Sequence, residues 1–167
     1  NSHGLSQSLT MFAALDSPVK ICLVKVANIT GRKRDLTITY YTRPVLGVDE
    51  NRTSPYIITW RDERGVLFAE NRYNNEFKGR VAFLATSIKE SSITGDRASF
   101  VGRSGDISEP IALTGESLSG ITGAGIDPCA AIMGKIQLEP EEEVSVVFVI
   151  GSETDTQQAA ELAIRFS

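Results

Sequence analysis

The stretch from 96 to 131 gathers the residue types that are most able to form a binding or contact site. It holds six glycines, and the charged side chains Asp96, Arg97, Arg103 and Asp127 lie along it. Glycine at this density favours loops that need positive φ or a close approach to another surface. These four side chains therefore form a candidate contact with carbohydrate or with a neighbouring domain. The alternative is that they form ion pairs that fix the loops internally.

Nucleotide binding is not the chemistry that this stretch favours. Gly120, Gly123 and Gly125 are spaced in the reverse order of the dinucleotide fingerprint, and no Gly-Lys-Ser/Thr follows them. Asp127 would repel phosphate where a helix is expected to begin. We therefore expect no nucleotide site.

The sequence also singles out no catalytic or metal centre. His3 is the sole histidine and lies near the start of the chain, where a catalytic base is poorly held. Cys22 and Cys129 lack metal-ligand spacing and lie among apolar residues, so we expect two reduced core cysteines. Glycoside hydrolysis needs two carboxylates about 5 to 10 Å apart, and the 21 acidic residues offer many pairs without selecting one. We assign no catalytic residue, no metal ligand and no cofactor.

A second candidate site lies around the aromatic residues between 56 and 77. The aromatic candidates are Tyr56, Trp60, Tyr73 and Phe77. Aromatic rings can stack on a sugar, although aromatic residues on strands are also common in the core. The polar loop 71–75 supplies hydrogen-bonding groups, and Asn71 and Arg72 are its candidate contacts with carbohydrate or another domain.

Composition is typical of one globular domain. A chain of 167 residues with 41% hydrophobic and 23% charged residues can bury a core without covalent cross-links. The net charge of −4 argues against general affinity for nucleic acid. No apolar run approaches the roughly 20 residues that span a bilayer, so we expect no direct insertion of this segment into a membrane. We treat residues 1–167 as one domain, a fragment of a larger multidomain protein.

Most of the chain alternates with the period of β-strands. At Val24 the apolar phase of the second expected strand changes, which indicates either a bulge or burial on both faces. A hairpin is expected around Gly65, and a second around the acidic turn 139–143. The expected strands are 9–15, 19–29, 36–41, 56–60, 66–70, 79–87, 98–101, 133–138 and 144–150.

Two helical segments are expected. Asp127-Pro128 has the form of a helix N-cap followed by proline, which predicts one helical turn. Asp155 begins a capping box, and apolar residues follow it at helical spacing to Phe166. That helix either packs on the sheet or leads into a further domain. Many strands against one helix predict an all-β fold, an antiparallel β-sandwich.

Six strings of the sequence resemble a known family. They are Ser-Pro-Val-Lys-Ile (17–21), Gly-Arg-Lys-Arg-Asp-Leu-Thr-Ile-Thr-Tyr-Tyr (31–41), Val-Leu-Gly (45–47), Glu-Phe-Lys-Gly-Arg-Val-Ala-Phe (76–83), Asp-Arg-Ala-Ser-Phe-Val-Gly-Arg (96–103) and Leu-Ser-Gly-Ile-Thr-Gly-Ala-Gly-Ile-Asp-Pro-Cys-Ala-Ala (118–131). Together they resemble the N-terminal β domain of glycoside hydrolase family 94, formerly glycosyltransferase family 36, which holds cellobiose and chitobiose phosphorylases. The similarity is greatest to the phosphorylase-like region of cyclic β-1,2-glucan synthases. The last two strings are the most specific, and the resemblance covers nearly the whole chain in order.

The resemblance implies a β-supersandwich of the galactose mutarotase-like kind, joined to an (α/α)6 barrel that carries the catalytic aspartate and the phosphate ligands. Inorganic phosphate would then be a co-substrate of the parent enzyme, bound outside this chain. The implied partners are β-glucan, the helical barrel of the same protein and a second copy in a homodimer. The implied location is the cytoplasm, with the parent protein attached to the inner membrane.

Two functions follow as hypotheses. The first is a non-catalytic accessory domain that packs against the helical barrel and shapes the mouth of its active site. In that case Asp96, Arg97, Arg103 and Asp127 hold the glycine-rich loops at the interface. The second is a free-standing carbohydrate-binding module for β-glucan, with Trp60 as the aromatic residue that tests it.

Overall fold

The computed structural model describes residues 3–73, 79–103 and 105–167. Its strands are β1 (Leu5–Ala13), β2 (Val19–Asn28), β3 (Arg34–Thr42), β4 (Ile57–Arg61), β5 (Leu67–Asn71), β6 (Val81–Thr86), β7 (Ser91–Asp96), β8 (Pro128–Leu138) and β9 (Glu143–Glu153). Its helices are α1 (Glu50–Thr53), α2 (Arg97–Val101) and α3 (Thr156–Phe166), with 3-10 turns η1 (Ser54–Tyr56) and η2 (Ile111–Thr114). The all-β class expected from the sequence is therefore confirmed.

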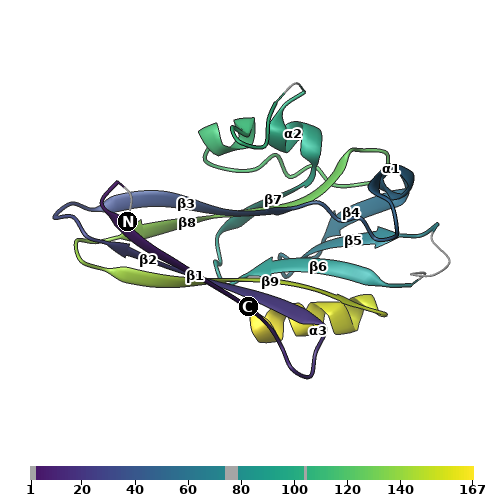
Figure 1. The fold of residues 1–167 in the computed structure, drawn as a ribbon, viewed down its shortest axis with the longest axis horizontal. Coiled ribbons are helices and arrows are strands. Elements are labelled where there is room, and N and C mark those ends of the chain that lie inside the picture. Colours follow the sequence, from purple (N-terminus) through teal and green to yellow (C-terminus); the bar gives the residue numbers. More distant parts are fainter. Residues whose placement is uncertain (1–2, 74–78, 104) are drawn as a thin grey trace.

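Two antiparallel sheets face each other and form a sandwich. The larger sheet has the strand order β1-β2-β9-β6-β5-β4, and the smaller has the order β3-β8-β7. Figure 1 shows the smaller sheet lying above the larger one, with α3 packed beneath the larger sheet. The larger sheet is therefore the middle layer of three.

Because it is the middle layer, the larger sheet is buried on both faces. Phe68 and Phe83 face α3, where Ala159, Ala160 and Ala163 are fully buried. Leu67, Leu84 and Phe148 face the smaller sheet. Short alanine side chains let the helix backbone approach the sheet closely, which explains an interface built from large residues on one side and small ones on the other.

The same two-sided burial explains the change of apolar phase in β2. Ile21 belongs to the core between the larger sheet and α3, whereas its neighbour Cys22 belongs to the core between the two sheets. The pairing of β2 with β1 and with β9 runs without a register shift. Burial on both faces is therefore the correct interpretation, and the bulge is not.

Several expected elements are confirmed. The hairpin of β4 and β5 closes at Gly65, whose φ is +88°. Asp155 accepts hydrogen bonds from the N–H groups of Gln157 and Gln158 and so begins α3 as expected. That helix packs on β6 and β9. Cys22 and Cys129 are both buried and free.

Three expectations were wrong. Residues 98–101 lie in helix α2, not in a strand, and the short strand of this region is β7. Pro128 begins the long strand β8, so no helical turn follows Asp127. The strands on either side of the acidic turn do not form a hairpin, because β8 pairs with β3 and β7 while β9 pairs with β2 and β6. The turn 139–142 instead crosses from one sheet to the other.

Candidate functional site

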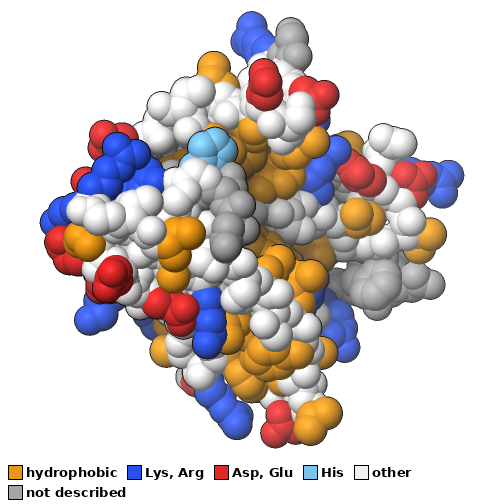
Figure 2. Space-filling model, turned by 60° about the vertical axis from the view of Figure 1, so that its left-hand side comes forward, with side chains coloured by type: hydrophobic (Ala, Val, Ile, Leu, Met, Phe, Trp, Pro, Cys, Tyr) orange, Lys and Arg blue, Asp and Glu red, His pale blue; other side chains and the backbone are white. Residues whose placement is uncertain are grey.

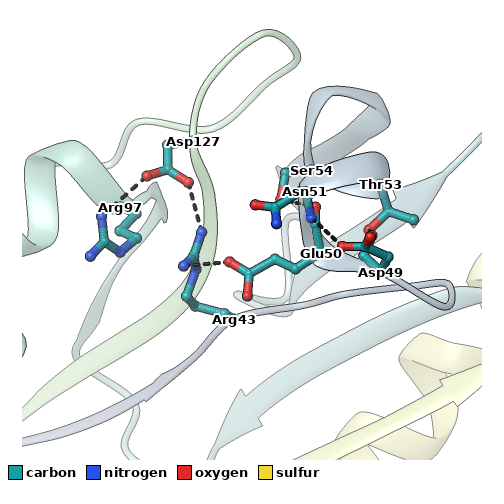
Figure 3. Close-up of polar contacts among 8 residues, drawn as sticks. All are labelled: Arg43, Asp49, Glu50, Asn51, Thr53, Ser54, Arg97 and Asp127. Carbon is teal, nitrogen blue, oxygen red and sulfur yellow. Dashed lines mark hydrogen bonds and ion pairs between the residues drawn. The ribbon is translucent and has the colours of Figure 1, made fainter.

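Asp127 joins three segments that are distant in the sequence. One carboxylate oxygen lies 3.1 Å from Nη2 of Arg43, at the end of β3, and the other lies 3.3 Å from Nη1 of Arg97, at the start of α2. Arg43 also pairs with Glu50 of α1. Figure 3 shows the four side chains linked in the order Arg97, Asp127, Arg43 and Glu50. The expected proximity of Arg97 and Asp127 is therefore observed as an internal ion pair.

The charges in this cluster balance. Two guanidinium groups face two carboxylates, so the cluster lacks the excess positive charge that binds an anion. Partial burial opposes the charge of Arg97, but the hydrogen bond and charge of Asp127, together with Tyr41, raise the Arg97 pKa. The backbone reinforces the link, since the N–H of Arg97 donates to the carbonyl of Asp127 at 2.7 Å. The arrangement fixes the start of β8 against α2.

Asp96 has a structural role that the sequence analysis missed. Its carboxylate accepts hydrogen bonds from the N–H groups of Ala98 at 3.3 Å and Ser99 at 3.0 Å, which caps the N-terminus of α2. An aspartate followed three residues later by a serine was a capping signal. The sequence analysis did not use this signal because it assigned residues 98–101 to a strand.

The glycine-rich loop that contains Gly120, Gly123 and Gly125 closes one side of the sandwich. The N–H of Thr59, on the edge strand β4, donates to the carbonyl of Gly123 at 3.0 Å. On the edge strand β7, Gly95 donates to the carbonyl of Ile121 at 2.7 Å, and the carbonyl of Ile93 accepts from Gly120 at 2.8 Å. The loop therefore bonds to one edge strand of each sheet.

Gly95 makes this closure possible. A Cβ atom at Gly95 would lie 2.1 Å from Oγ1 of Thr59 and 2.8 Å from its Cβ. Oγ1 of Thr59 also accepts a hydrogen bond from the N–H of Gly123. Glycine is thus required at position 95 by the close approach of β7, β4 and the loop.

Arg103 lies apart from the charged cluster. It is exposed and follows α2, in the segment 102–121, whose described residues 102–103 and 105–121 project above the smaller sheet in Figure 1. Among the described residues it forms no ion pair. Four large apolar side chains are exposed in this projecting segment: Ile107, Ile111, Leu113 and Ile121. We call residues 102–121 the projecting segment below.

The aromatic candidates that the structure describes differ in exposure, since Trp60 packs on the core and Tyr56 and Tyr73 lie at the surface. Trp60 stacks on Phe68, with 5.4 Å between the ring centroids, and is half-buried against the core between the larger sheet and α3. It is therefore a packing residue rather than an exposed sugar platform. Phe77 lies outside the described residues.

Tyr56 and Tyr73 do form an exposed aromatic pair. Their rings stack with centroids 4.4 Å apart, and they are 44% and 73% exposed. They border a hollow of about 560 Å³ that is otherwise lined mainly by the residues of α1 and its flanks: Val48, Asp49, Asn51, Arg52, Thr53, Pro55 and Asn71. Figure 3 shows how Asp49 caps α1 beside Asn51 and Thr53. Asp49 before Glu50 is an N-cap signal that could have identified α1 from the sequence.

The two polar candidates next to this hollow have internal partners. Asn71 is 3% exposed, and its side chain donates to the carbonyl of Leu46 at 3.0 Å and accepts from the N–H of Tyr73 at 3.1 Å. It thereby positions Tyr73. Arg72 is exposed and pairs with Glu70 at 2.9 Å. Asn71 shapes the hollow, whereas Arg72 lies on the surface.

Two buried titratable groups, Cys129 and Tyr40, have raised pKa values. Burial, followed by the charges of Asp96 and Asp127, raises the pKa of Cys129 to about 12, so this thiol stays protonated at neutral pH. Burial also raises the pKa of Tyr40 to about 12. A nucleophilic cysteine needs the opposite shift. Within the described ranges, no three His, Cys, Asp or Glu side chains cluster closely enough to hold a metal ion.

Fold and site together define an antiparallel β-sandwich domain whose glycine-rich loops are held by internal ion pairs and backbone hydrogen bonds. The family model "Glycosyl hydrolase 94, supersandwich domain" matches residues 1–167. The chain belongs to this family, which confirms the resemblance found in the sequence.

Two further proteins are similar to the chain. The "Cyclic beta-(1,2)-glucan synthase NdvB" of Rhizobium meliloti (strain 1021) is 32% identical over 143 residues, which are 84% of this chain and 5% of that protein. A solved structure named "Putative kojibiose phosphorylase from human microbiome" has a TM-score of 0.42 and 10% identity, over 97% of this chain and 20% of that one. The chain therefore spans a small part of each of these proteins.

The helices of the described residues are short. None has both the length and the hydropathy that a membrane-spanning helix requires.

Proposed function

We propose that this chain is a non-catalytic accessory domain of a larger carbohydrate-active enzyme of family 94. In this proposal the domain packs against a helical barrel of the same protein and shapes the mouth of the active site there. The barrel, and not this chain, binds inorganic phosphate, and the chain itself needs no cofactor. The protein works in the cytoplasm, with its longer form attached to the inner membrane.

The observation that carries the proposal is the projecting segment. Ile107, Ile111, Leu113 and Ile121 are between 44% and 59% exposed within a span of 15 residues. Ile111 and Leu113 line one hollow of this segment, and exposed apolar side chains that lie close together mark contact surfaces. Arg103 lies in the same segment, is exposed and forms no ion pair with another residue that the structure describes, which suits an interface with a polar rim. The ion pairs of Asp127 hold the base of this segment in place.

The hollows of the described residues support a role without catalysis. A hollow of about 500 Å³ is lined mainly by apolar residues, together with Lys20 and Arg43, and none of its lining residues carries a carboxylate. Another, on the outer face of the smaller sheet, is lined by Asp35, Glu90 and Glu116, but all three are exposed. A hydrogen bond from Lys135 lowers the pKa of Glu116. A general acid for glycosidic bonds needs the reverse, a carboxyl whose pKa burial has raised.

Two measurements test the proposal. Incubation of the 167-residue chain with phosphate and β-glucosides should release no glucose 1-phosphate, and measurable release would overturn the assignment. The helical barrel of the parent protein, produced separately, should bind the chain in calorimetry. The double variant Ile111→Asp/Leu113→Asp should weaken that binding at least about tenfold, because it places charge in an apolar contact. Ile164→Asp, an equally exposed site on α3, is the control and should bind as the unmodified chain does.

The stacked tyrosines favour a second candidate function, recognition of carbohydrate. Tyr56 and Tyr73 present an exposed aromatic surface beside the amide of Asn51 and the guanidinium of Arg52. A sugar can stack on such a surface while neighbouring polar groups bind its hydroxyls. The chain would then act as a binding module for β-glucan.

Calorimetry with β-1,2-gluco-oligosaccharides distinguishes this function from the first. Micromolar binding that disappears in Tyr56→Ala supports the module. Trp60→Ala should not abolish such binding selectively, because Trp60 packs on Phe68 and its loss acts through stability. Absence of binding to the unmodified chain removes this candidate and leaves the accessory role standing.

A further inference from the structure

A hollow beside the last turn of α3 is lined by cations and by no acidic side chain. It lies where the β4–β5 turn, the connection from β6 to β7 and the end of α3 meet, and its volume is about 410 Å³. Its charged lining residues are Arg61, Arg64 and Lys89, and we call it the cationic hollow. Over the face shown in Figure 2, by contrast, Lys and Arg side chains are interspersed with Asp and Glu side chains. The hollow is therefore a local concentration of positive charge.

One of the three cations has an acidic partner. Nε of Arg64 lies 3.0 Å from the carboxylate of Asp62, whereas the other two cations form no ion pair with a residue that the structure describes. Glu63 and Glu90 are close in the sequence but do not line the hollow. The C-terminus of α3 adds a partial negative charge of about one half. The hollow thus faces an excess of roughly one and a half positive charges.

Arg61 is held in position by backbone groups rather than by a carboxylate. Its Nη2 donates a hydrogen bond to the carbonyl of Ser91, in β7, at 3.3 Å. Its guanidinium also lies against the β4–β5 turn, since a Cβ atom at Gly65 would be 3.1 Å from Nη2. A guanidinium has five N–H donors, so one bond to a carbonyl leaves donors for a bidentate contact with an anion.

The lining also provides a hydroxyl donor and an apolar wall. Oγ of Ser87 accepts a hydrogen bond from the N–H of Val147 at 2.9 Å, which fixes the oxygen. That bond does not use the hydroxyl proton, so the proton can be donated to a ligand oxygen. Ile88 and Ile164 add apolar surface to the same hollow. The lining therefore suits an anionic group that is attached to a small organic group.

We propose that the cationic hollow binds a phosphomonoester, with the phosphate between Arg61 and Lys89 and the organic group against the apolar wall. A phosphomonoester carries about 1.5 to 2 negative charges at neutral pH, which matches the excess of positive charge, whereas a carboxylate carries one. Its oxygens also fit the planar fork of the Arg61 guanidinium. The volume lies within the range of roughly 300 to 1,000 Å³ that is typical of sites for small organic molecules.

This binding site is separate from the two functions proposed above. The cationic hollow shares no lining residue with the hollow of Tyr56 and Tyr73, and none of its lining residues belongs to the projecting segment. The lining has no carboxylate side chain that could act as a general acid or base. The site therefore binds its ligand without converting it.

NMR titration of the 167-residue chain tests the class of ligand. Two glycines added after Ser167 move the terminal carboxylate away from the hollow. Phenyl phosphate should shift the Nε–H signal of Arg61 and the amide signals of Gly65 and Ser87. Benzoate, which has the same ring and a single charge, should bind at least about tenfold more weakly. Absence of shifts with phenyl phosphate, or equal affinity for benzoate, overturns the proposal.

Inorganic phosphate distinguishes an ester from the bare ion. It has the charge of the phosphate group but makes no contact with the apolar wall, so it should bind more weakly than phenyl phosphate. Equal affinity for the two would overturn the assignment to an ester.

Removal of single charges tests the position of the site. Arg61→Gln should weaken the binding of phenyl phosphate at least about tenfold, and Lys89→Gln should also weaken it, because each removes a cation that has no acidic partner among the described residues. Both side chains are exposed, so both variants should fold. Arg72→Gln is the matched control, since Arg72 is exposed, pairs with Glu70 and lies outside the hollow. Unchanged affinity in Arg61→Gln, or an equal loss in Arg72→Gln, contradicts the proposed site.

Discussion

Asp127 shows how a single carboxylate can organise a loop region without being buried. It is 40% exposed and still lies between two guanidinium groups that are about one-third exposed. Exposed ion pairs contribute little individually, about 0 to 1 kcal/mol, because solvent screens them and the side chains lose freedom. Here one carboxylate serves two pairs, and the backbone bond from Arg97 holds it in place. The expected contribution is therefore toward the upper end of that range.

We predict that Asp127→Asn lowers the free energy of unfolding by about 1 kcal/mol. The substitution keeps the size of the side chain and removes its charge, which leaves Arg43 and Arg97 facing each other. The loss should shrink in 1 M salt, where screening acts over about 3 Å. Urea denaturation at low and high salt measures both effects.

Glu116→Gln is the matched control for this prediction. It removes one carboxylate from a single pair with Lys135, and Glu116 is 87% exposed. No measurable change in stability is expected. Equal losses in both variants, or a loss at Asp127 that salt leaves unchanged, would show that charge pairing is not the cause.

Residue types indicated part of the candidate site. The association of Arg97 with Asp127 could be anticipated because both charges lie in one glycine-rich stretch. Arg43 and Glu50 were missed, since nothing in the sequence shows that the end of β3 lies beside residue 127. Trp60 was misjudged because period-2 patterning does not say which face of a strand is covered. Only the docking of α3 buries that side.

At the scale of elements, the glycine-rich loop replaces a strand. The loop forms backbone hydrogen bonds with the edge strands β4 and β7, yet it forms no regular ladder with either strand. The Oγ groups of Thr94, Ser99 and Ser119 form a hydrogen-bonded cluster at about 3 Å that ties the loop to β7 and α2. Such satisfied polar contacts position the loop without burying much of it. The closeness of β7 and β4 then depends on Gly95.

We predict that Gly95→Ala destabilises the domain by about 2 to 4 kcal/mol, because the new methyl group overlaps Thr59 and must move β4 or the loop. Gly31→Ala is the control, since a Cβ atom at that position meets no atom within 4 Å and its φ is not positive. It should change stability by less than about 1 kcal/mol. Thermal unfolding of both variants measures the difference.

A smaller loss in Gly95→Ala than in Gly31→Ala would contradict the close approach of the two strands. A crystal structure of Gly95→Ala should show the hydrogen bond from Thr59 to Gly123 lengthened or lost, because that bond lies at the point of overlap.

Local periodicity predicted which segments are strands far better than it predicted their partners. The strands 133–138 and 144–150 were both expected, and both lie within β8 and β9. Their separation by a short acidic turn favoured a hairpin, yet they occupy different sheets. The distinction depends on the pairing of β8 with β3 and of β9 with β2, strands that lie more than 80 residues apart along the chain in both cases. A pattern of a few residues contains no information about such partners.

At the scale of the whole molecule, apolar side chains are buried on both faces of each sheet. Tyr40 packs on the core between the sheets, whereas Cys129 is buried on the other face of the smaller sheet, with Phe100 and Val101 of α2. Burial raises the pKa of Cys129 from 9.0 to about 12, and that of Tyr40 from 10.0 to about 12. In the unfolded chain both groups lose their protons at lower pH than in the folded chain. The folded state therefore binds more protons over this interval, and its stability must fall as pH rises through it.

We predict that the free energy of unfolding falls as pH rises from about 9 toward 12, with each of these groups contributing at most about 1.4 kcal/mol per pH unit. Below pH 9 both groups are protonated in either state, so they add no pH dependence. Cys129→Ala should show a shallower slope, because the buried thiol then no longer contributes. Ile132→Val, which trims an uncharged side chain of the same buried strand, should lose stability equally at every pH. Urea denaturation at pH 8, 9, 10 and 11 measures the free energy of unfolding of each variant. If this free energy changes equally with pH in Cys129→Ala and in the unmodified chain, the buried thiol is not responsible.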